Sequence, residues 1–320
     1  MDCIAVLTSG GDAPGMNAAI RAVVRTALGR GARVFGCQRG YDGLLDDELA
    51  EMRSTDVGGI IGSGGTILRT ARSKRFRQPE QRREAGRNLR ERGIEGLVVI
   101  GGDGTLKGAR ALCDECDFPI MGVPASIDND LPCTDASIGF DTAVNTALDA
   151  VDRVRDTAYS HERVFVIEVM GRRNGFIAVE AGLAGGAEAI LIPEVPYDLQ
   201  NVCDRLKAGH RRGKRSSIIV VAEGAASAVE IHDLIREKTG YDARYLVLGH
   251  MQRGGHPTAF DRVLATRLGA AAANRLLNGT RGEMVGVRGN QVISTPFEII
   301  SRTERRIDPE RLLLAEVMAQ

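Results

Sequence analysis

The chain has 320 residues, 43% of them hydrophobic, which is long enough for a large buried core and predicts two domains. Lys and Arg together number 42, as do Asp and Glu, so no overall charge draws the chain to nucleic acid or to an anionic membrane. The chain starts in an apolar strand pattern without a charged leader, and no apolar run approaches the about 18 residues of a membrane-spanning helix. We therefore expect a cytoplasmic protein that binds neither nucleic acid nor a membrane.

Short apolar runs alternate with helical patterns along the whole chain. Strands are expected over residues 4–7, 33–38, 97–100, 119–123, 164–169, 189–192, 218–222 and 245–248, with a hairpin over 285–293. Helices are expected after residue 17, over about 105–112 and 141–157, up to 185, and over about 199–211, 228–238, 260–277 and 309–318. This alternation predicts an α/β fold of two Rossmann-like, three-layer domains with mostly parallel sheets and the active site in the cleft between them.

The domain boundary rests on a weak signal near residue 139. We expect the first domain to comprise residues 1–138 and about 251–300, and the second to comprise 139–250 and about 301–320. Within the first, the glycine-rich residues 58–65 are expected to be mobile. The basic run over 69–92 is typical of a solvated helix face, although arginines near its start could face a site.

The six cysteines are scattered, mostly within apolar segments, which is typical of reduced thiols rather than of a disulfide framework. Only Cys113 and Cys116 form a Cys-x-x-Cys pair. Because no second pair follows at zinc-site spacing, we do not expect a metal or redox site there.

A glycine-rich turn follows the most apolar strand, in the sequence VVIGGDGT over residues 98–105. Such a turn lets backbone N–H groups approach a bound phosphate, and its one carboxylate, Asp103, suits Mg²⁺ among phosphate oxygens. A tight turn without a ligand is the alternative. The turn over residues 8–17 is a second phosphate cradle at a helix N-terminus. It lacks the dinucleotide glycine spacing, and no ribose-binding acid follows the next strand, so an oxidoreductase is poorly supported.

Two carboxylates, Asp128 and Asp130, lie in a loop after another strand. A sugar hydroxyl must lose its proton as it attacks a phosphoryl group, and a positioned carboxylate can accept that proton. The alternative is an Asx-turn that only shapes the loop.

Basic and polar side chains follow the later strands. Arg172 and Arg253 could bind phosphate oxygens or stabilise charge on a migrating phosphoryl group, His250 could hydrogen-bond substrate oxygens, and Glu223 could hold sugar hydroxyls. Surface solvation, a structural histidine and a helix-capping acid are the alternatives. Taken together, the loops indicate phosphoryl transfer from a nucleotide to a hydroxyl, a reaction that depends on positioning, Mg²⁺ and cationic charge.

Five motifs occur in one order along the chain. They are TSGGDAPGMN at residues 8–17, GGDGT at 101–105, PASIDND at 124–130, VMGR at 169–172 and GHMQRGG at 249–255. In sequence and order they resemble the motifs of bacterial ATP-dependent 6-phosphofructokinases, and the resemblance covers nearly the whole chain.

The resemblance implies transfer of the γ-phosphoryl group of ATP to the 1-hydroxyl of fructose 6-phosphate, giving fructose 1,6-bisphosphate and ADP in the committed step of glycolysis. The implied catalytic residues are Asp128 as base, with Arg72, Arg172 and Ser126. The implied ATP contacts are Gly11, Tyr41, Arg72, Ser73, Arg77, Gly102, Asp103, Gly104 and Thr105, with Asp103 on Mg²⁺. The implied sugar-phosphate contacts are Ser126, Asp128, Asp130, Arg163, Met170, Gly171, Arg172, Glu223, Arg244, His250 and Arg253. The first domain is then the nucleotide-binding one and the second the sugar-phosphate-binding one.

The chain departs from the family pattern at a few positions. Diphosphate-dependent relatives carry Asp in place of Gly104 and Lys in place of Ala125, so ATP is favoured as the donor. Ala125 stands where ATP-dependent members commonly have glycine, and Ser126 where threonine is usual. Ser73 replaces the usual aromatic residue, which leaves the packing of adenine open.

The resemblance also implies regulation and assembly. The residues that match the family's effector pocket for ADP or phosphoenolpyruvate are Arg21, Arg25, Arg155, Glu188, Arg212, Lys214 and Arg215. Exposed helix arginines are the alternative, and Ser54, Gly58 and Gly59 depart from the pocket, so the effector and its sign stay open. Arg163 and Arg244 match arginines that reach a neighbouring subunit's substrate, which implies a homotetramer with shared sites.

The sequence leaves three rival functions. A diphosphate-dependent phosphofructokinase is the nearest. NAD and lipid kinases share the GGDGT motif but lack the loops at 124–130 and 249–255. A non-catalytic regulatory subunit is disfavoured because Asp103, Asp128 and Arg172 are all present.

Overall fold

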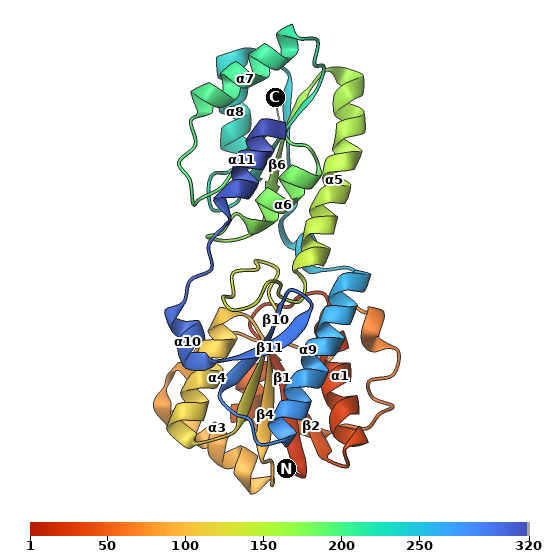
Figure 1. Ribbon diagram of the computed structural model, residues 1–320, viewed down its shortest axis with the longest axis vertical. Helices are drawn as coiled ribbons and strands as arrows, with labels where there is room; N and C mark the ends of the chain where they lie inside the picture. The colour runs from red at the N-terminus through yellow and green to blue at the C-terminus, as the bar shows by residue number, and fades with distance from the viewer. Residues whose placement is uncertain (319–320) are drawn as a thin grey trace. The chain divides into compact units, whose positions relative to one another are not determined.

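The computed structural model describes residues 1–318, which form two units (Figure 1). The first unit contains Met1–Ser126, Asp130–Asp141 and Arg253–Arg305, and the second contains Ile127–Asn129, Thr142–Gln252 and the chain from Arg306 onward. The short segment Ile127–Asn129 therefore groups with the second unit, whereas the sequence pattern assigned all of residues 1–138 to the first domain. Residues 319 and 320 of the expected last segment lie outside the described residues.

The first unit is built on a seven-stranded sheet in the order β11-β10-β5-β4-β1-β2-β3. Its strands are β1 (Cys3–Ser9), β2 (Arg33–Cys37), β3 (Leu49–Glu51), β4 (Gly96–Gly101), β5 (Ile120–Pro124), β10 (Glu283–Arg288) and β11 (Gln291–Pro296). The five central strands are parallel, and β3 and β11 pair antiparallel at the two edges. Strands β1, β4 and β5 are buried along their whole length, which explains why their sequences are continuous apolar runs.

Helices cover both faces of this sheet (Figure 1). They are α1 (Met16–Gly29), α2 (Gly40–Leu45), α3 (Pro79–Glu91), α4 (Asp103–Cys116), α9 (Ala259–Leu277) and α10 (Phe297–Arg302), with short 3-10 turns η1 (Ile60–Gly62) and η2 (Arg75–Arg77). One core cluster joins α2, α3, α4 and α10 to one face of the strands, for example Leu89 and Leu112 against Leu97. Helices α1 and α9 pack against each other, where Gly269 leaves room for the carbonyl of Ala19.

The second unit has a four-stranded, all-parallel sheet in the order β7-β8-β6-β9. Its strands are β6 (Val164–Val169), β7 (Ala189–Leu191), β8 (Ser217–Ala222) and β9 (Ala243–Val247). Its helices are α5 (Phe140–His161), α6 (Phe176–Ala184), α7 (Leu199–Arg211), α8 (Ala228–Thr239) and α11 (Pro309–Met318), and η3 (Gly249–Arg253) follows β9. Helices α7 and α8 bury an apolar stripe against this sheet, and Asp198 and Ser227 cap their N-termini through side-chain oxygens.

The predicted α/β class is confirmed, and the structure corrects the sequence reading in several places. The helices expected over 105–112 and 141–157 extend to Asp103–Cys116 and Phe140–His161, and α2, β3 and α10 were not predicted. The segment over 58–65 was expected to be mobile, but it contains η1 and the amide of Asn17 binds the carbonyls of Ser63 and Gly64. No helix among residues 1–318 is both long and apolar enough to cross a membrane.

The basic run and the cysteines are also placed by the fold. Arg82 of α3 was expected on a solvated face, yet it is buried and its guanidinium pairs with Glu115. All six cysteines carry free thiols. Burial raises the pKa of Cys3, Cys37, Cys113, Cys116 and Cys203.

Two helical glycines allow a matched test of packing around α2. A Cβ on Gly43 would lie 1.7 Å from the carbonyl oxygen of Gln38, whereas a Cβ on Gly29 at the end of α1 would meet nothing within 4 Å. We expect Gly43→Ala to lower the free energy of unfolding by about 1–3 kcal/mol because the backbone must shift. Gly29→Ala should be neutral or stabilising by up to about 1 kcal/mol. Urea unfolding of both variants measures this, and equal effects would contradict it.

Candidate active site

The first unit brings three polar turns to one edge of its sheet. Because β5, β4 and β1 are adjacent and parallel, their carboxyl ends meet there. The hydroxyl of Thr105 donates a hydrogen bond of 2.8 Å to the carbonyl of Ser9, which joins the turn after β4 to the turn after β1. A Cβ on Gly102 would lie 3.7 Å from the Cβ of Ser126, so the turn after β5 is close as well. The Ser126 hydroxyl in turn donates to Asp130 at 3.2 Å.

Glycine shapes both cradles. Gly10 and Gly15 have φ values of 88° and 105°, a region that side-chain-bearing residues rarely adopt, and Gly15 precedes the first turn of α1. Gly102 precedes α4, which begins at Asp103. The N-terminus of α4 begins with the exposed residues Asp103 and Gly104, and it offers the positive end of a helix dipole there. The first turn of α1 is buried, and the Met16 N–H donates to the Ala13 carbonyl at 3.2 Å.

Asp103 is the candidate magnesium ligand. Its carboxylate is about half exposed and pairs with Lys107 one turn further along α4, at 2.7 Å. Among residues 1–318 there is no group of three or more acidic, histidine or cysteine side chains that could hold a metal by themselves. One exposed carboxylate beside a phosphate cradle fits Mg²⁺, which usually binds one or two carboxylates together with substrate phosphates and water.

Arg253 lies across the first turn. Its guanidinium pairs with Asp12 at 2.6 Å, and a Cβ on Gly11 would lie 2.7 Å from the same group. Arg253 and Gly11 are therefore neighbours within the first unit. The resemblance assigns Arg253 to sugar phosphate and Gly11 to ATP, so this arrangement joins residues expected to serve different substrates.

Tyr41 is buried rather than open to a ligand. Its ring stacks on Phe76 with 4.0 Å between centroids and 8° between planes, and its hydroxyl donates to the carbonyl of Thr105 at 2.6 Å. The same ring lies against Gly108 of α4, where a Cβ would come within 2.8 Å of it. Arg72 and Arg77, by contrast, are exposed on the segment that leads to α3.

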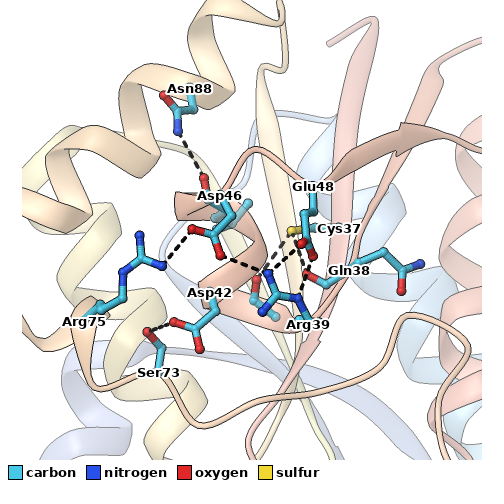
Figure 2. Close-up of polar contacts among 11 residues, drawn as sticks. Cys37, Gln38, Arg39, Asp42, Asp46, Glu48, Ser73, Arg75 and Asn88 are labelled. Atoms are coloured by element: carbon cyan, nitrogen blue, oxygen red, sulfur yellow. Dashed lines mark hydrogen bonds and ion pairs between the residues drawn. The ribbon is translucent and has the colours of Figure 1, made fainter.

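A charged network surrounds this segment (Figure 2). Asp46 accepts hydrogen bonds from Arg75 at 2.7 Å and Arg39 at 2.9 Å, and Arg39 also pairs with Glu48. The hydroxyl of Ser73 donates to Asp42 at 2.5 Å. The bonds from Arg75 and then Arg39 hold the pKa of Asp46 below its usual value.

The second unit pairs an acid with an arginine. Oδ2 of Asp128 lies 3.4 Å from Nε of Arg172, and the Asp128 side chain is 5% exposed. Arg172 has a φ of 54°, and one carboxylate oxygen of Glu223 accepts hydrogen bonds from its N–H and from that of Gly171. A Cβ on Gly224 would lie 2.1 Å from the Arg172 carbonyl. Glu223 and Gly224, at the end of β8, therefore hold the turn after β6.

Gln252 is a residue that the sequence reasoning missed. It is fully buried, its side-chain oxygen accepts from the Met170 N–H at 2.7 Å, and its amide donates to the Ala143 carbonyl at 3.4 Å. The signal was its place inside the GHMQRGG motif, between the two residues that were assigned roles. Gln252 fixes the loop after β9 to the turn after β6, while His250 is exposed on the same loop.

Two further expected contacts meet at one carboxylate. Asp242 pairs with Arg163 at 2.7 Å and with Arg244 at 2.5 Å. The hydrogen bond from Arg163 is the main reason why the pKa of Asp242 is below its usual value. Both arginines thus lie together at the start of β6 and β9, away from the carboxyl ends that carry Arg172 and Gln252.

The expected effector residues divide between the units. In the second unit, Arg155 donates to the carbonyls of Gly185 and Gly186, and buried Glu188 pairs with Lys214 at 2.7 Å. Arg212 and Arg215 lie on the same exposed connection as Lys214, and Arg215 pairs with Glu162. Arg21 and Arg25 lie on α1 in the first unit.

The fold and these turns are those of an α/β phosphotransferase, with glycine-rich turns before α1 and α4 in one unit and an acid–arginine pair in the other. Residues 3–276 match the phosphofructokinase family, and the chain belongs to that family. It is 57% identical to ATP-dependent 6-phosphofructokinase 1 of Thermus thermophilus over 98% of each chain. It is 50% identical to the ATP-dependent 6-phosphofructokinase of Thermotoga neapolitana over the full length of both.

A solved structure is also similar. Phosphofructokinase from Saccharomyces cerevisiae matches with a TM-score of 0.88 and 37% identity over 94% of this chain. The match spans 45% of the yeast chain, so this chain corresponds to less than half of that protein.

The Asp46 network makes stability depend on pH. The native pKa of Asp46 is lowered, so its charge stabilises the fold above the ordinary Asp pKa of about 3.9, and this contribution is lost as pH falls through the lower native value. We expect Asp46→Asn to unfold at lower urea concentration than the parent at pH 7, with the gap closing below about pH 4. Asp149→Asn, which breaks an exposed pair with Arg153 on α5, is the control. A gap that is independent of pH would contradict the role of the charge.

Proposed function

We propose that the chain transfers the γ-phosphoryl group of ATP to the 1-hydroxyl of fructose 6-phosphate, giving fructose 1,6-bisphosphate and ADP. The observation that carries this proposal is the buried Asp128 carboxylate, 3.4 Å from Arg172, in a chain that matches curated ATP-dependent 6-phosphofructokinases over its full length. A coupled assay for ADP with fructose 6-phosphate, ATP and Mg²⁺ tests it. Turnover with diphosphate in place of ATP would favour the diphosphate-dependent alternative.

The acid and the arginine divide the chemistry at the acceptor. Asp128 accepts the proton of the sugar 1-hydroxyl while the oxygen of that hydroxyl attacks the γ-phosphorus of ATP. The bond between the γ-phosphorus and the oxygen that bridges it to the β-phosphate breaks, and ADP leaves. Arg172, whose backbone is held by Glu223, stabilises negative charge on the phosphoryl oxygens in transit.

The donor is held by the first unit. Backbone N–H groups within residues 11–15 and 102–104 would bind phosphate oxygens, and Arg72 adds a cation. Asp103 would hold Mg²⁺, which neutralises charge on the β- and γ-phosphates when bound. Gly11, Ser73, Arg77, Gly102, Gly104 and Thr105 complete the proposed ATP contacts. Tyr41 contributes by supporting the segment beneath Arg72, since its ring is covered by Phe76.

Polar side chains and backbone groups are proposed to bind the acceptor's sugar and phosphate. Asp130, Met170, Gly171, Glu223 and His250 are proposed contacts of the sugar, with Ser126 beside Asp130. Arg163 and Arg244, which share Asp242, would bind the 6-phosphate of a neighbouring subunit's substrate. This role needs a neighbouring copy of the chain, and we propose the homotetramer with shared sites that the resemblance implies, acting in the cytoplasm.

Regulation is proposed at a second anion site. Arg155, Arg212, Lys214 and Arg215 in the second unit, with Arg21 and Arg25 supplied by the first unit of another copy, would bind ADP or phosphoenolpyruvate. The Lys214 pair with Glu188 and the Arg155 bonds to the carbonyls of Gly185 and Gly186 support a preformed basic pocket there.

Asp128→Ser tests the base. We expect turnover to fall by about two to four orders of magnitude with little change in the KM of either substrate, because a base acts chiefly in the transition state. Steady-state kinetics measure this. Asp152→Ser, on the exposed side of α5, is the matched control and should keep parental turnover. Parental turnover by Asp128→Ser would remove Asp128 from the mechanism.

Gly104→Asp tests the choice of donor. A Cβ at Gly104 meets nothing within 4 Å, so the variant should fold, while its carboxylate would enter the phosphate cradle beside Asp103. We expect kcat/KM for ATP to fall at least about tenfold through charge repulsion, with the melting temperature nearly unchanged. Gly104→Ala controls for size. Unchanged ATP kinetics in the Asp variant would show that donor phosphates do not approach this position.

A further inference from the structure

The segment over residues 69–77 is held on both sides of Arg72. On its N-terminal side it is tied to β1 and the first glycine turn. The Thr8 hydroxyl donates to the Arg69 carbonyl at 2.8 Å, the Thr70 hydroxyl donates to the Gly10 carbonyl at 2.9 Å, and the Gly10 N–H donates to the Ala71 carbonyl at 3.3 Å. The residue immediately before Arg72 is therefore fixed to the phosphate cradle itself.

On its C-terminal side the segment is tied to α2. The Ser73 hydroxyl donates to Asp42 at 2.5 Å (Figure 2). It also accepts from the N–H of Phe76, within the 3-10 turn η2, at 3.1 Å. Arg75 then binds Asp46, and the Phe76 ring stacks on Tyr41. The residue immediately after Arg72 is therefore fixed to a side chain of α2.

Of the arginines near this segment, Arg39 and Arg75 form ion pairs within the described part of the protein and Arg72 does not. Arg75 and Arg39 are neutralised by Asp46 and Glu48, as Figure 2 shows. Arg72 lies between the two anchors, is exposed, and makes no ion pair with any described residue. Acidic side chains between α2 and β3 thus bind Arg75 and Arg39, and the guanidinium of Arg72 is left for an anion.

We propose that Asp42, acting through Ser73, is a positioning residue that orients Arg72 toward the phosphates of the nucleotide. This rests on the proposed function, which assigns Arg72 to ATP. The hydrogen bond from Ser73 to Asp42 fixes the residue that follows Arg72 to α2. The segment then contributes through the orientation of its arginine.

A double-variant cycle in the full-length enzyme tests the proposal. Removing the hydroxyl in Ser73→Ala should lower kcat/KM for ATP about fivefold, while KM for fructose 6-phosphate stays unchanged, because a charged donor is misplaced but not lost. Arg72→Lys keeps a cation, and with it measurable turnover, but loses the fork geometry. In the Arg72→Lys background, Ser73→Ala should cost less than about twofold. Asp42→Ala should lower kcat/KM for ATP as much as Ser73→Ala does. Ser73→Thr, which keeps the hydroxyl, should have the parental kcat/KM for ATP.

The control variant removes a neighbouring ion pair that does not involve Ser73 or Arg72. Arg92→Ala breaks the exposed pair of Arg92 with Asp47, one residue from Asp46, and should leave kcat/KM for ATP unchanged. An equal loss from Ser73→Ala in both backgrounds, or no loss at all, would overturn the positioning role. An enzyme that binds ATP but does not phosphorylate fructose 6-phosphate would overturn the proposed function instead. The same cycle on the dissociation constant of MgATP, by titration calorimetry, then decides the role of Asp42.

Discussion

The hydrogen bond from the buried Thr105 hydroxyl to the Ser9 carbonyl is the contact on which the first unit's site depends. Its donor belongs to the first turn of α4 and its acceptor is the last residue of β1, so it fixes two glycine turns at a set spacing. Tyr41 holds the carbonyl of the same threonine, and Gly101 and Gly10 leave space for its side chain. A hydroxyl expected to face the nucleotide is thus already engaged by protein, and the cradle offers backbone N–H groups instead.

In the second unit, a carboxylate and a side-chain amide fix the turn that contains Arg172. Besides its proposed contact with the sugar, Glu223 accepts two backbone N–H groups, from Gly171 and Arg172, through one carboxylate oxygen. Gln252 adds a third such contact at Met170. Backbone in the left-handed region, as at Arg172, persists only where surrounding groups over-determine it, and these contacts do so. The arginine beside Asp128 is therefore oriented by its backbone as well as by the ion pair.

Sequence patterns predicted the long and strongly periodic elements well. Strand β4 and helix α5 follow directly from a continuous apolar run and from a helical spacing of apolar residues, and the hairpin of β10 and β11 follows from its short polar turn. The short elements α2, β3 and α10 were missed because three to six residues are too few to show a period. The burial of Arg82 and the role of Gln252 were also missed, since both depend on partners distant in sequence, Glu115 and Met170. The order of the motifs indicated which loops contain polar site residues. It did not indicate that Glu223 and Gln252 accept hydrogen bonds from backbone N–H groups of the neighbouring turn.

The thiols described above have a practical consequence. Five cysteines sit where burial disfavours the thiolate, and the thiolate is the form that attacks disulfides, alkylating reagents and peroxides. Cys113 and Cys116, despite their motif spacing, are therefore slow to be oxidised or labelled. A new cysteine on an exposed helix would therefore react with a fluorophore ahead of these five, and replacing the partly exposed Cys133 first would make such labelling site-specific.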